Sequence, residues 1–311
     1  MSVLAPWLMA YYEQAQEWRR SGKFHHALLI SGINGVGQNA FAEALTKLLL
    51  CEHIDRAPCG KCHSCQVAQA DTHPDLQILD GQDGGIKVDA VRQVAAKVAN
   101  KPQLGYSKVV LIHEAHRMNT NAANAILKAL EEPPAATYFV LTTHTSRALM
   151  PTILSRCQRM LLPTPSEVQV TEWLYHEAKV DVSKLMWFSQ TPYHLLALST
   201  SNSFDMLQQL PDWLERWLQG GMRTDEFAGK ANKDNTADFI DGLLALLSAA
   251  VQYSASGQCN ALVQGACTSL LTRYDIYRLM GFVQSLTELK SQLDKTHLNP
   301  TIQIIGELNS W

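Results

Sequence analysis

Four cysteines in the first quarter of the chain have a spacing that is typical of a metal site. They follow the pattern C-x7-C-x2-C-x2-C and are Cys51, Cys59, Cys62 and Cys65. Two cysteines separated by two residues can point both thiolates at one ion, and four thiolates complete a tetrahedral Zn²⁺ site with no position left for water. We therefore predict one structural zinc ion per chain, which stabilises an insertion with little core of its own.

Two alternatives to this ligand set stay open. The spacing is irregular compared with two separated C-x2-C knuckles, so His53 or His63 can take the place of one cysteine. An iron–sulfur cluster is less favoured, because nothing near the cysteines indicates redox chemistry. The other three cysteines are isolated in the sequence and are interpreted as core or surface thiols: Cys157, Cys259 and Cys267.

A glycine-rich loop has the pattern of a phosphate-binding loop between a strand and a helix. Its glycines are Gly32, Gly35 and Gly37. In such a loop, backbone N–H groups and the following helix N-terminus surround phosphate oxygens. A working loop continues with Lys, which neutralises the β- and γ-phosphates, and with Ser or Thr, which ligates Mg²⁺. This chain has Gln38 and Asn39 there, so we predict a degenerate cofactor site that does not bind ATP.

The second part of a nucleotide site is altered as well. A buried strand over 108–112 is expected to end in Asp-Glu, whose aspartate holds Mg²⁺, but His113 and Glu114 follow it. Glu114 stands where a water-polarising base is expected, yet without bound Mg-ATP it has nothing to act on. His116 and His144 lack metal-ligand spacing, so we interpret them, with His113, as polar residues at the edge of a sheet.

Strand and helix patterns alternate along the first half of the chain. Apolar runs predict buried strands, helical patterns lie between them, and the alternation predicts an α/β domain with a mostly parallel sheet covered on both faces. The predicted strands span 26–31, 76–79, 108–112 and 137–142, and the clearest helices span 88–98 and 121–132. After Pro163 and Pro165 only helical periodicity is found, which predicts a domain boundary there.

Composition excludes several classes of protein. The 311 residues are enough for about two domains, and 46% of them are hydrophobic and 18% charged. No stretch approaches the ~20 apolar residues of a membrane span, and the N-terminus lacks the basic flank of a signal peptide. A net charge of −3 argues against a dedicated polyanion binder. We expect a cytoplasmic protein without a membrane partner, whose cysteines stay reduced.

Five further segments join the glycine loop and the cysteines in an order that identifies a family. They read HALL at 26–29, HPDL at 73–76, IKVDAVR at 86–92, NAILKALEEPP at 124–134 and TILSRC at 152–157. Together they resemble the clamp-loader subunits of bacterial DNA polymerase III, a branch of the AAA+ ATPases. The resemblance covers about the first 160 residues and is closest to the subunits that lack an intact ATP site.

The resemblance implies a domain organisation and a set of partners. Residues 1–164 would form an AAA+ P-loop-type domain that carries the zinc module at 51–65, residues 165–208 a small all-α lid, and residues 209–311 an all-α collar. In this family the collars assemble the subunits into an open ring. The implied partners are the motor subunits gamma and tau, the delta subunit and, through the assembled complex, the sliding clamp and primer-template DNA.

Arg156 and Ser155 belong to the Ser-Arg-Cys motif of this family. The resemblance implies that Arg156 is an arginine finger that meets ATP bound by a neighbouring subunit. A finger supplied in this way accelerates phosphoryl transfer by about 10³- to 10⁵-fold. The sequence alone also allows a surface arginine that forms a salt bridge to a helix.

The leading hypothesis is a clamp-loader subunit without independent catalytic activity. It would present Arg156 to the ATP of a neighbour and help to load a sliding clamp on primed DNA. One alternative is an active AAA+ ATPase that tolerates Gln38 and Asn39. The other is a zinc-dependent nucleic-acid-binding module unrelated to replication.

Overall fold

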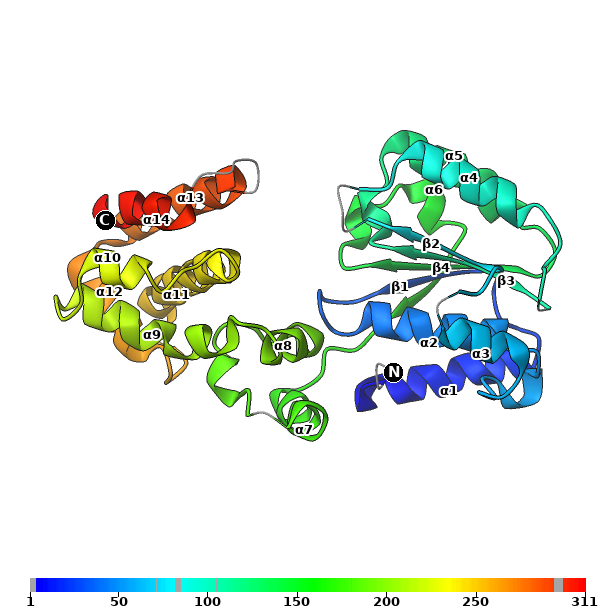
Figure 1. The fold of residues 1–311 in the computed structure, drawn as a ribbon, viewed down its shortest axis with the longest axis horizontal. Helices are drawn as coiled ribbons and strands as arrows, with labels where there is room; N and C mark the ends of the chain where they lie inside the picture. The colour runs from blue at the N-terminus through cyan, green and yellow to red at the C-terminus, as the bar shows by residue number, and fades with distance from the viewer. Residues whose placement is uncertain (1–3, 71, 82–84, 105, 180, 294–298) are drawn as a thin grey trace. The chain divides into compact units, whose positions relative to one another are not determined.

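The chain forms two compact units, Met1–Gln169 and Val170–Trp311. The structure is a computed structural model that describes residues 4–311 apart from 71, 82–84, 105, 180 and 294–298 (Figure 1). The first unit holds the sheet, and the described part of the second is helical. Each unit has its own buried core.

A five-stranded sheet in the order β2-β3-β4-β1-β5 lies at the centre of the first unit. All of its neighbouring strands are parallel, and β1 pairs with both β4 and β5. The strands are β1 Ala27–Ser31, β2 Leu76–Asp80, β3 Lys108–His113, β4 Thr137–Thr143 and β5 Gln158–Leu161. The predicted α/β class and parallel sheet are confirmed, while β5 was not predicted, because its four residues mix polar and apolar types at an edge.

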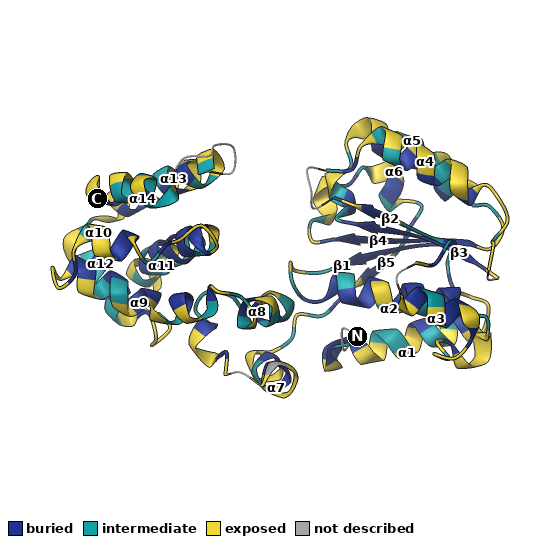
Figure 2. Cartoon of the chain, in the orientation of Figure 1, coloured by how far each residue is buried: buried dark blue, intermediate teal, exposed yellow. Residues whose placement is uncertain are grey.

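Helices cover both faces of this sheet (Figure 1). On one face lie α1 Pro6–Arg20, α2 Gln38–Leu50 and α3 His63–Gln69; on the other lie α4 Val88–Val98, α5 Thr120–Glu131 and α6 Pro151–Leu154. Three short 3-10 helices join them: η1 Ile54–Arg56, η2 Ala115–Arg117 and η3 Ser146–Ala148. The central strands β1, β3 and β4 are buried, the edge strands β2 and β5 are partly exposed, and the outer helix faces are exposed (Figure 2), as expected for a parallel sheet covered by helices.

Helix α5 shows how local sequence sets an element's limits. The Asn119 side chain accepts a hydrogen bond from the Ala122 N–H at 2.8 Å and so caps the first turn. The helix ends at Glu131, two residues before Pro133, because proline disfavours a helical residue in front of it. This end point places Glu131 at the rim of the unit, where its side chain is 47% exposed.

The second unit is built around the long helix α11 Thr236–Ser256. α11 contacts α9 Phe204–Leu218, α12 Gln264–Arg273 and α13 Ile276–Leu293. A Cβ at Gly242 would lie 2.4 Å from Leu210 Cδ2, so a larger residue there would force the Leu210 side chain of α9 to shift. The remaining helices are α7 Glu167–Ala178, η4 Ser183–Leu185, α8 Pro192–Ser199, α10 Thr224–Ala228 and α14 Pro300–Asn309. The division of the helical region into a lid (165–208) and a collar (209–311) stays a prediction, as does the boundary at residue 164.

By length and composition alone, α11 could cross a membrane, which differs from the expectation that no stretch approaches such a span. A single helix of this kind is weak evidence, because the central helix of a globular unit passes the same test. Residues along one broad face of α11, among them Phe239, Leu243 and Leu247, are fully buried. Its apolar character is therefore explained by packing within the second unit.

Candidate functional site

The glycine loop joins β1 to α2 at the carboxyl end of the sheet. Gly35 and Gly37 have φ angles of 77° and 113°, in the left-handed region that favours glycine. Gln38 begins α2 and turns back over the loop, where its Nε2 donates to the carbonyl oxygens of Gly32 at 2.9 Å and Ile33 at 2.7 Å. The loop therefore has a neutral, buried amide where a phosphate site has a lysine.

Asn39 is tied to the edge of the sheet. Its Oδ1 accepts from Thr142 Oγ1 at 3.0 Å, and Thr142 Oγ1 in turn accepts from the Glu114 backbone N–H at 3.2 Å. These contacts link α2, the end of β4 and the residue after β3. The side chain in the position of a Mg²⁺-ligating hydroxyl is thus already engaged within the chain.

His113 ends β3 in place of an acidic residue, and it is buried. Burial lowers the pKa of its imidazole, against opposing effects of Asp80, Glu43 and Glu114. Its Nδ1 has no hydrogen-bond partner among the described residues. Because an imidazole is neutral or positively charged, His113 cannot supply the negative charge that an aspartate at this position would offer to a metal ion.

Glu114 lies between two histidines. Its backbone is left-handed, with a φ of 52°, and its Oε2 lies 2.8 Å from His144 Nδ1 and 3.4 Å from His116 Nε2. Burial and the neighbouring His144 lower the pKa of His116. We interpreted His113, His116 and His144 as polar rim residues without metal-ligand spacing, and this missed the grouping of Glu114, His116 and His144. The rings of His116 and His144 pack edge to face with their centroids 4.4 Å apart.

Arg156 follows α6 and the motif residue Ser155. Its Nη1 donates to the Thr152 carbonyl oxygen at 2.8 Å and to Ser155 Oγ at 3.1 Å. Its Nη2 forms an ion pair with Glu131 Oε1, and the Arg156 side chain is 31% exposed. The salt bridge that the sequence allowed as an alternative role is thus present in the isolated chain.

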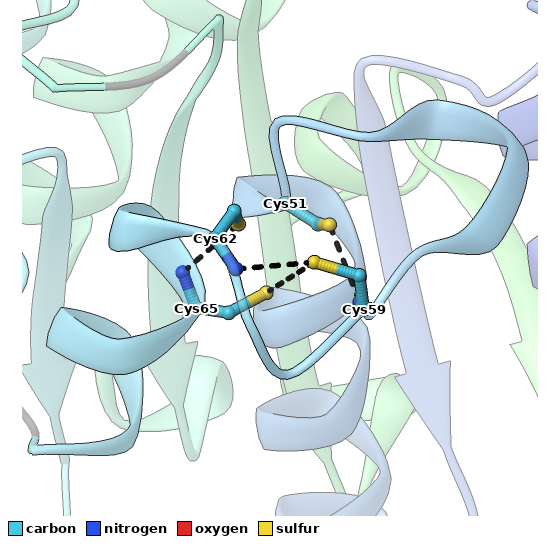
Figure 3. Close-up of side chains that lie close together, drawn as sticks. All are labelled: Cys51, Cys59, Cys62 and Cys65. Carbon is cyan, nitrogen blue, oxygen red and sulfur yellow. Dashed lines mark hydrogen bonds between the residues drawn. The ribbon is translucent and has the colours of Figure 1, made fainter.

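The four cysteines converge, as Figure 3 shows. Their Sγ atoms all lie within 4.8 Å of one another, and no disulfide joins them. Cys51 follows the end of α2, Cys62 caps α3, and Cys65 lies in its first turn. Neither His53 nor His63 belongs to the group, so the open alternative of a histidine ligand is not supported.

Backbone N–H groups surround these sulfur atoms. The Cys59 and His53 N–H groups each donate to Cys51 Sγ at 3.4 Å, and the Cys62 N–H donates to Cys59 Sγ at 3.3 Å. The N–H groups of Lys61 and Cys62 lower the pKa of the Cys59 thiol to about 6, whereas burial raises the pKa of Cys51 and Cys65. Donors of this kind stabilise thiolates, so the residues fit a thiophilic metal ion such as zinc.

The HPDL segment, which had no assigned role, anchors the loop between α4 and β3. Asp75 is 2% exposed, and its carboxylate accepts from the backbone N–H groups of Gln103 at 2.7 Å and Leu104 at 2.9 Å. His73 Nδ1 accepts from the Asp75 N–H at 3.1 Å, and its Nε2 lies 2.7 Å from Ser64 Oγ. The sequence signal for this polar network was an aspartate directly after a proline, Pro74-Asp75, but the sequence does not show that this aspartate is buried.

Two of the three isolated cysteines also meet in the second unit, which sequence spacing did not indicate. Cys259 Sγ lies 3.6 Å from Cys267 Sγ, across the start of α12. Cys157 is buried beside Arg156, and burial raises its pKa to about 12. The motif cysteine is therefore a core thiol, one of the two roles that the sequence left open.

The chain is similar to known replication proteins over most of its length. The sequence profile of the family described as "DNA polymerase III, delta subunit" matches residues 9–166. DNA polymerase III subunit delta' of Haemophilus influenzae is 35% identical over 260 residues, which cover 81% of this chain and 79% of that protein. The Escherichia coli subunit delta' is 32% identical over 297 residues, covering 93% and 89% of the two chains.

Two further comparisons concern related subunits. The tau/gamma subunit of Haemophilus influenzae is 37% identical over 158 residues, half of this chain and 23% of that one. A solved gamma subunit-related protein of Thermotoga maritima aligns with a TM-score of 0.50 at 20% identity, over 95% of this chain and 97% of that one, which agrees with the fold. Because the delta' proteins match along both units, the chain belongs to the DNA polymerase III delta' family.

Proposed function

We propose that this chain is the delta'-type member of a DNA polymerase III clamp loader, acting in the cytoplasm. It would assemble with motor subunits of the gamma/tau type and a delta subunit, and help to load a sliding clamp on primed DNA. Support comes from the delta' relatives that match 81% and 93% of the chain. The match to a tau/gamma subunit over half of the chain agrees with assembly from related subunits.

Its own nucleotide site does not hydrolyse ATP. The observation that carries this part is the pair of hydrogen bonds from Gln38 to the loop carbonyls, which replaces a phosphate-binding cation with an internal contact. The contacts of Asn39 and Glu114 support the same conclusion, because both side chains are engaged within the chain. A base held by histidines, with no metal-bound triphosphate before it, has no water to activate.

Arg156 acts on ATP that is bound by a neighbouring subunit. Its support is the Ser-Arg-Cys motif together with the partial exposure of the Arg156 side chain after the end of α6. In the assembled ring Arg156 would exchange Glu131 for the γ-phosphate of ATP on the adjacent motor subunit, while Ser155 and the Thr152 carbonyl keep the side chain oriented. A planar guanidinium spreads positive charge over the phosphoryl oxygens in the transition state.

The cysteine cluster binds one Zn²⁺ with a structural role. Four thiolate ligands leave no position for substrate or water, so the ion cross-links the segment between α2 and α3 and takes no part in catalysis. Metal analysis of freshly purified chain should find one zinc ion, and zinc-free reduced protein would remove this assignment.

The function is tested by reconstitution. The chain is mixed with motor and delta subunits, and complex formation, ATPase activity and clamp loading on primed DNA are measured. Arg156→Ala should leave assembly intact and slow turnover at the site it faces by about 10³-fold, so that the total rate falls by the share of that site. Arg159→Ala is the matched control, since Arg159 is an exposed arginine on the neighbouring strand β5. Unchanged turnover in Arg156→Ala would exclude the finger.

The isolated chain separates the alternatives. It should show neither ATP turnover nor tight ATP binding. Micromolar ATP affinity with hydrolysis would instead favour an active ATPase. Salt-sensitive DNA binding without any complex with the other subunits would favour a nucleic-acid-binding module.

A further inference from the structure

The grouping of Glu114, His116 and His144, here named the histidine–glutamate cluster, carries an inference beyond the clamp-loader role. Each residue offers one ligand atom, and the three atoms lie within 4.8 Å of one another. Two imidazoles and one carboxylate are a ligand set that proteins use for zinc and similar divalent metals. The cluster shares no residue with the cysteine site.

The sheet topology brings these residues together. Glu114 directly follows β3, His116 lies in η2, and His144 directly follows β4. Because β3 and β4 are parallel neighbours, their carboxyl ends meet at one edge of the sheet. Three ligands from the ends of two buried strands are held by rigid elements, which favours a defined site.

Contacts outside the cluster fix its orientation. Thr143, which is fully buried, places its Oγ1 3.1 Å from His116 Nδ1, so that Nε2 faces Glu114. The Glu114 backbone is fixed by its N–H bond to Thr142 Oγ1. Partners of this kind set the ring orientation of metal-ligating histidines.

The distance from Glu114 to His116 suits a small cation, whereas the distance from Glu114 to His144 is that of an ion pair and would lengthen by about 0.5 Å when an ion enters. The Glu114 Oε2 atom lies 2.8 Å from His144 Nδ1 and 3.4 Å from His116 Nε2. A tetrahedral ion with bonds of about 2.0–2.2 Å holds neighbouring ligand atoms roughly 3.3–3.6 Å apart. The same oxygen is buried, and no well-aligned hydrogen bond reaches it from the described residues. The carboxylate thus points into a site that a cation would complete.

One side of the cluster is open. The side chains of His116 and Glu114 are 10% and 15% exposed, whereas that of His144 is 31% exposed. Three protein ligands with one accessible side match a site whose fourth position is taken by water or an added ligand.

We propose that the histidine–glutamate cluster is a second metal site, which binds a divalent transition ion of the zinc class through Glu114, His116 and His144. The bound ion ties the segment after β3 to the segment after β4. This inference does not depend on the clamp-loader role or on the cysteine site.

The test uses the full chain and Zn²⁺ as the probe. After purification the zinc content is measured, the chain is titrated with Zn²⁺, and calorimetry and metal analysis count the ions bound. The expected result is one zinc ion more than the cysteine cluster holds. His116→Ala and His144→Ala should each lose that additional ion, and His176→Ala, which changes an exposed histidine on α7, should keep it.

A second variant and a second probe keep the outcome interpretable. Thr143→Val retains all three ligands but removes the hydroxyl that contacts His116 Nδ1. The affinity for the additional ion should therefore fall by about 10- to 100-fold. With Co²⁺, thiolate-to-metal absorption reports the cysteine site alone, so failure of one site is distinguished from failure of the other. The proposal is overturned if the unaltered chain takes up no additional ion, or if His116→Ala and His144→Ala still bind it.

Discussion

At the scale of single residues, the ion pair between Arg156 and Glu131 is suited to exchange. Both side chains are partly exposed, at 31% and 47%, and exposed pairs contribute only about 0–1 kcal/mol to stability. Glu131→Gln should therefore change the free energy of unfolding by less than about 1 kcal/mol, as measured by urea denaturation. A loss above about 2 kcal/mol would show that the pair is structural and that Arg156 is not free to leave it.

Asp75 presents the opposite case, a buried carboxylate that accepts two backbone N–H groups. Asp75→Asn leaves one oxygen acceptor, so one N–H of the loop loses its partner, and we expect a loss of about 1–3 kcal/mol. Asp89→Asn is the matched control, because that side chain is 82% exposed and its replacement should stay within about 0.5 kcal/mol. Equal urea midpoints for the two variants would contradict a structural role for the HPDL segment.

The sequence predicts which residues meet at some of these sites and not at others, and the difference has a physical reason. The cysteines lie within one short segment, so their spacing predicts their meeting. Glu114 and His144 meet only because β3 and β4 are neighbours in register, which a single sequence does not specify. The partners of Gln38 and Arg156 were equally hidden, since both depend on side-chain orientation.

At the scale of elements, the proposed zinc ion would stabilise the segment between α2 and α3. Besides η1 it has little regular structure. A structural zinc contributes roughly 10–16 kcal/mol, as much as a whole domain's stability of about 5–15 kcal/mol. Removal of zinc by a chelator should therefore open residues 51–65 while the sheet stays folded.

Hydrogen exchange measured by mass spectrometry checks this expectation. Amides of Cys59, Cys62 and Cys65 should lose protection after chelation, and amides of β3 and β4 should keep it. Retained protection throughout 51–65 would show that packing alone holds the segment.

The contacts of His73 predict a pH dependence for the same region. Burial is the largest effect on its imidazole and lowers its pKa below the ordinary value of 6.5. The imidazole of His73 therefore binds a proton more readily in the unfolded chain than in the folded chain. Its contribution to the free energy of unfolding is present above about pH 6.5 and is lost as the pH falls through the folded-state pKa. Protonation of Nδ1 also breaks the bond from the Asp75 N–H.

A variant isolates this contribution. His73→Asn keeps an acceptor for the Asp75 N–H but does not titrate, so its urea midpoint should fall less than that of the unaltered chain between about pH 7.5 and 5.5. Parallel pH profiles for the two proteins would exclude His73 as the titrating group, since His113 and His116 also have lowered pKa values.

Elements were the most predictable level of this protein. Four strands and the helices between them follow from apolar runs and from stops such as Pro133. Strand β5 was not predicted because Gln158 and Arg159 interrupt its apolar character. Whether a short segment joins the edge of a sheet depends on the strand beside it rather than on the hydrophobic pattern of the segment itself.

At the scale of the whole molecule, the chain has two cores that can be perturbed separately. Phe239 of α11 is fully buried and packs on Phe227 with ring centroids 5.5 Å apart. Phe239→Ala should cost about 3–5 kcal/mol of stability in the second unit. In hydrogen exchange the loss should appear in α9, α11 and α12, and an equal loss across the sheet would contradict separate cores.

The parallel order of the sheet has a consequence for synthesis on the ribosome. Ala27 of β1 pairs with Phe139, and Leu28 pairs with Gln158, so both partners of β1 emerge more than 100 residues after it. At ~5–20 residues per second, the apolar strand waits roughly 6 to 26 seconds for them. During that time the nascent chain exposes a segment that chaperones recognise, and slower translation lengthens the exposure.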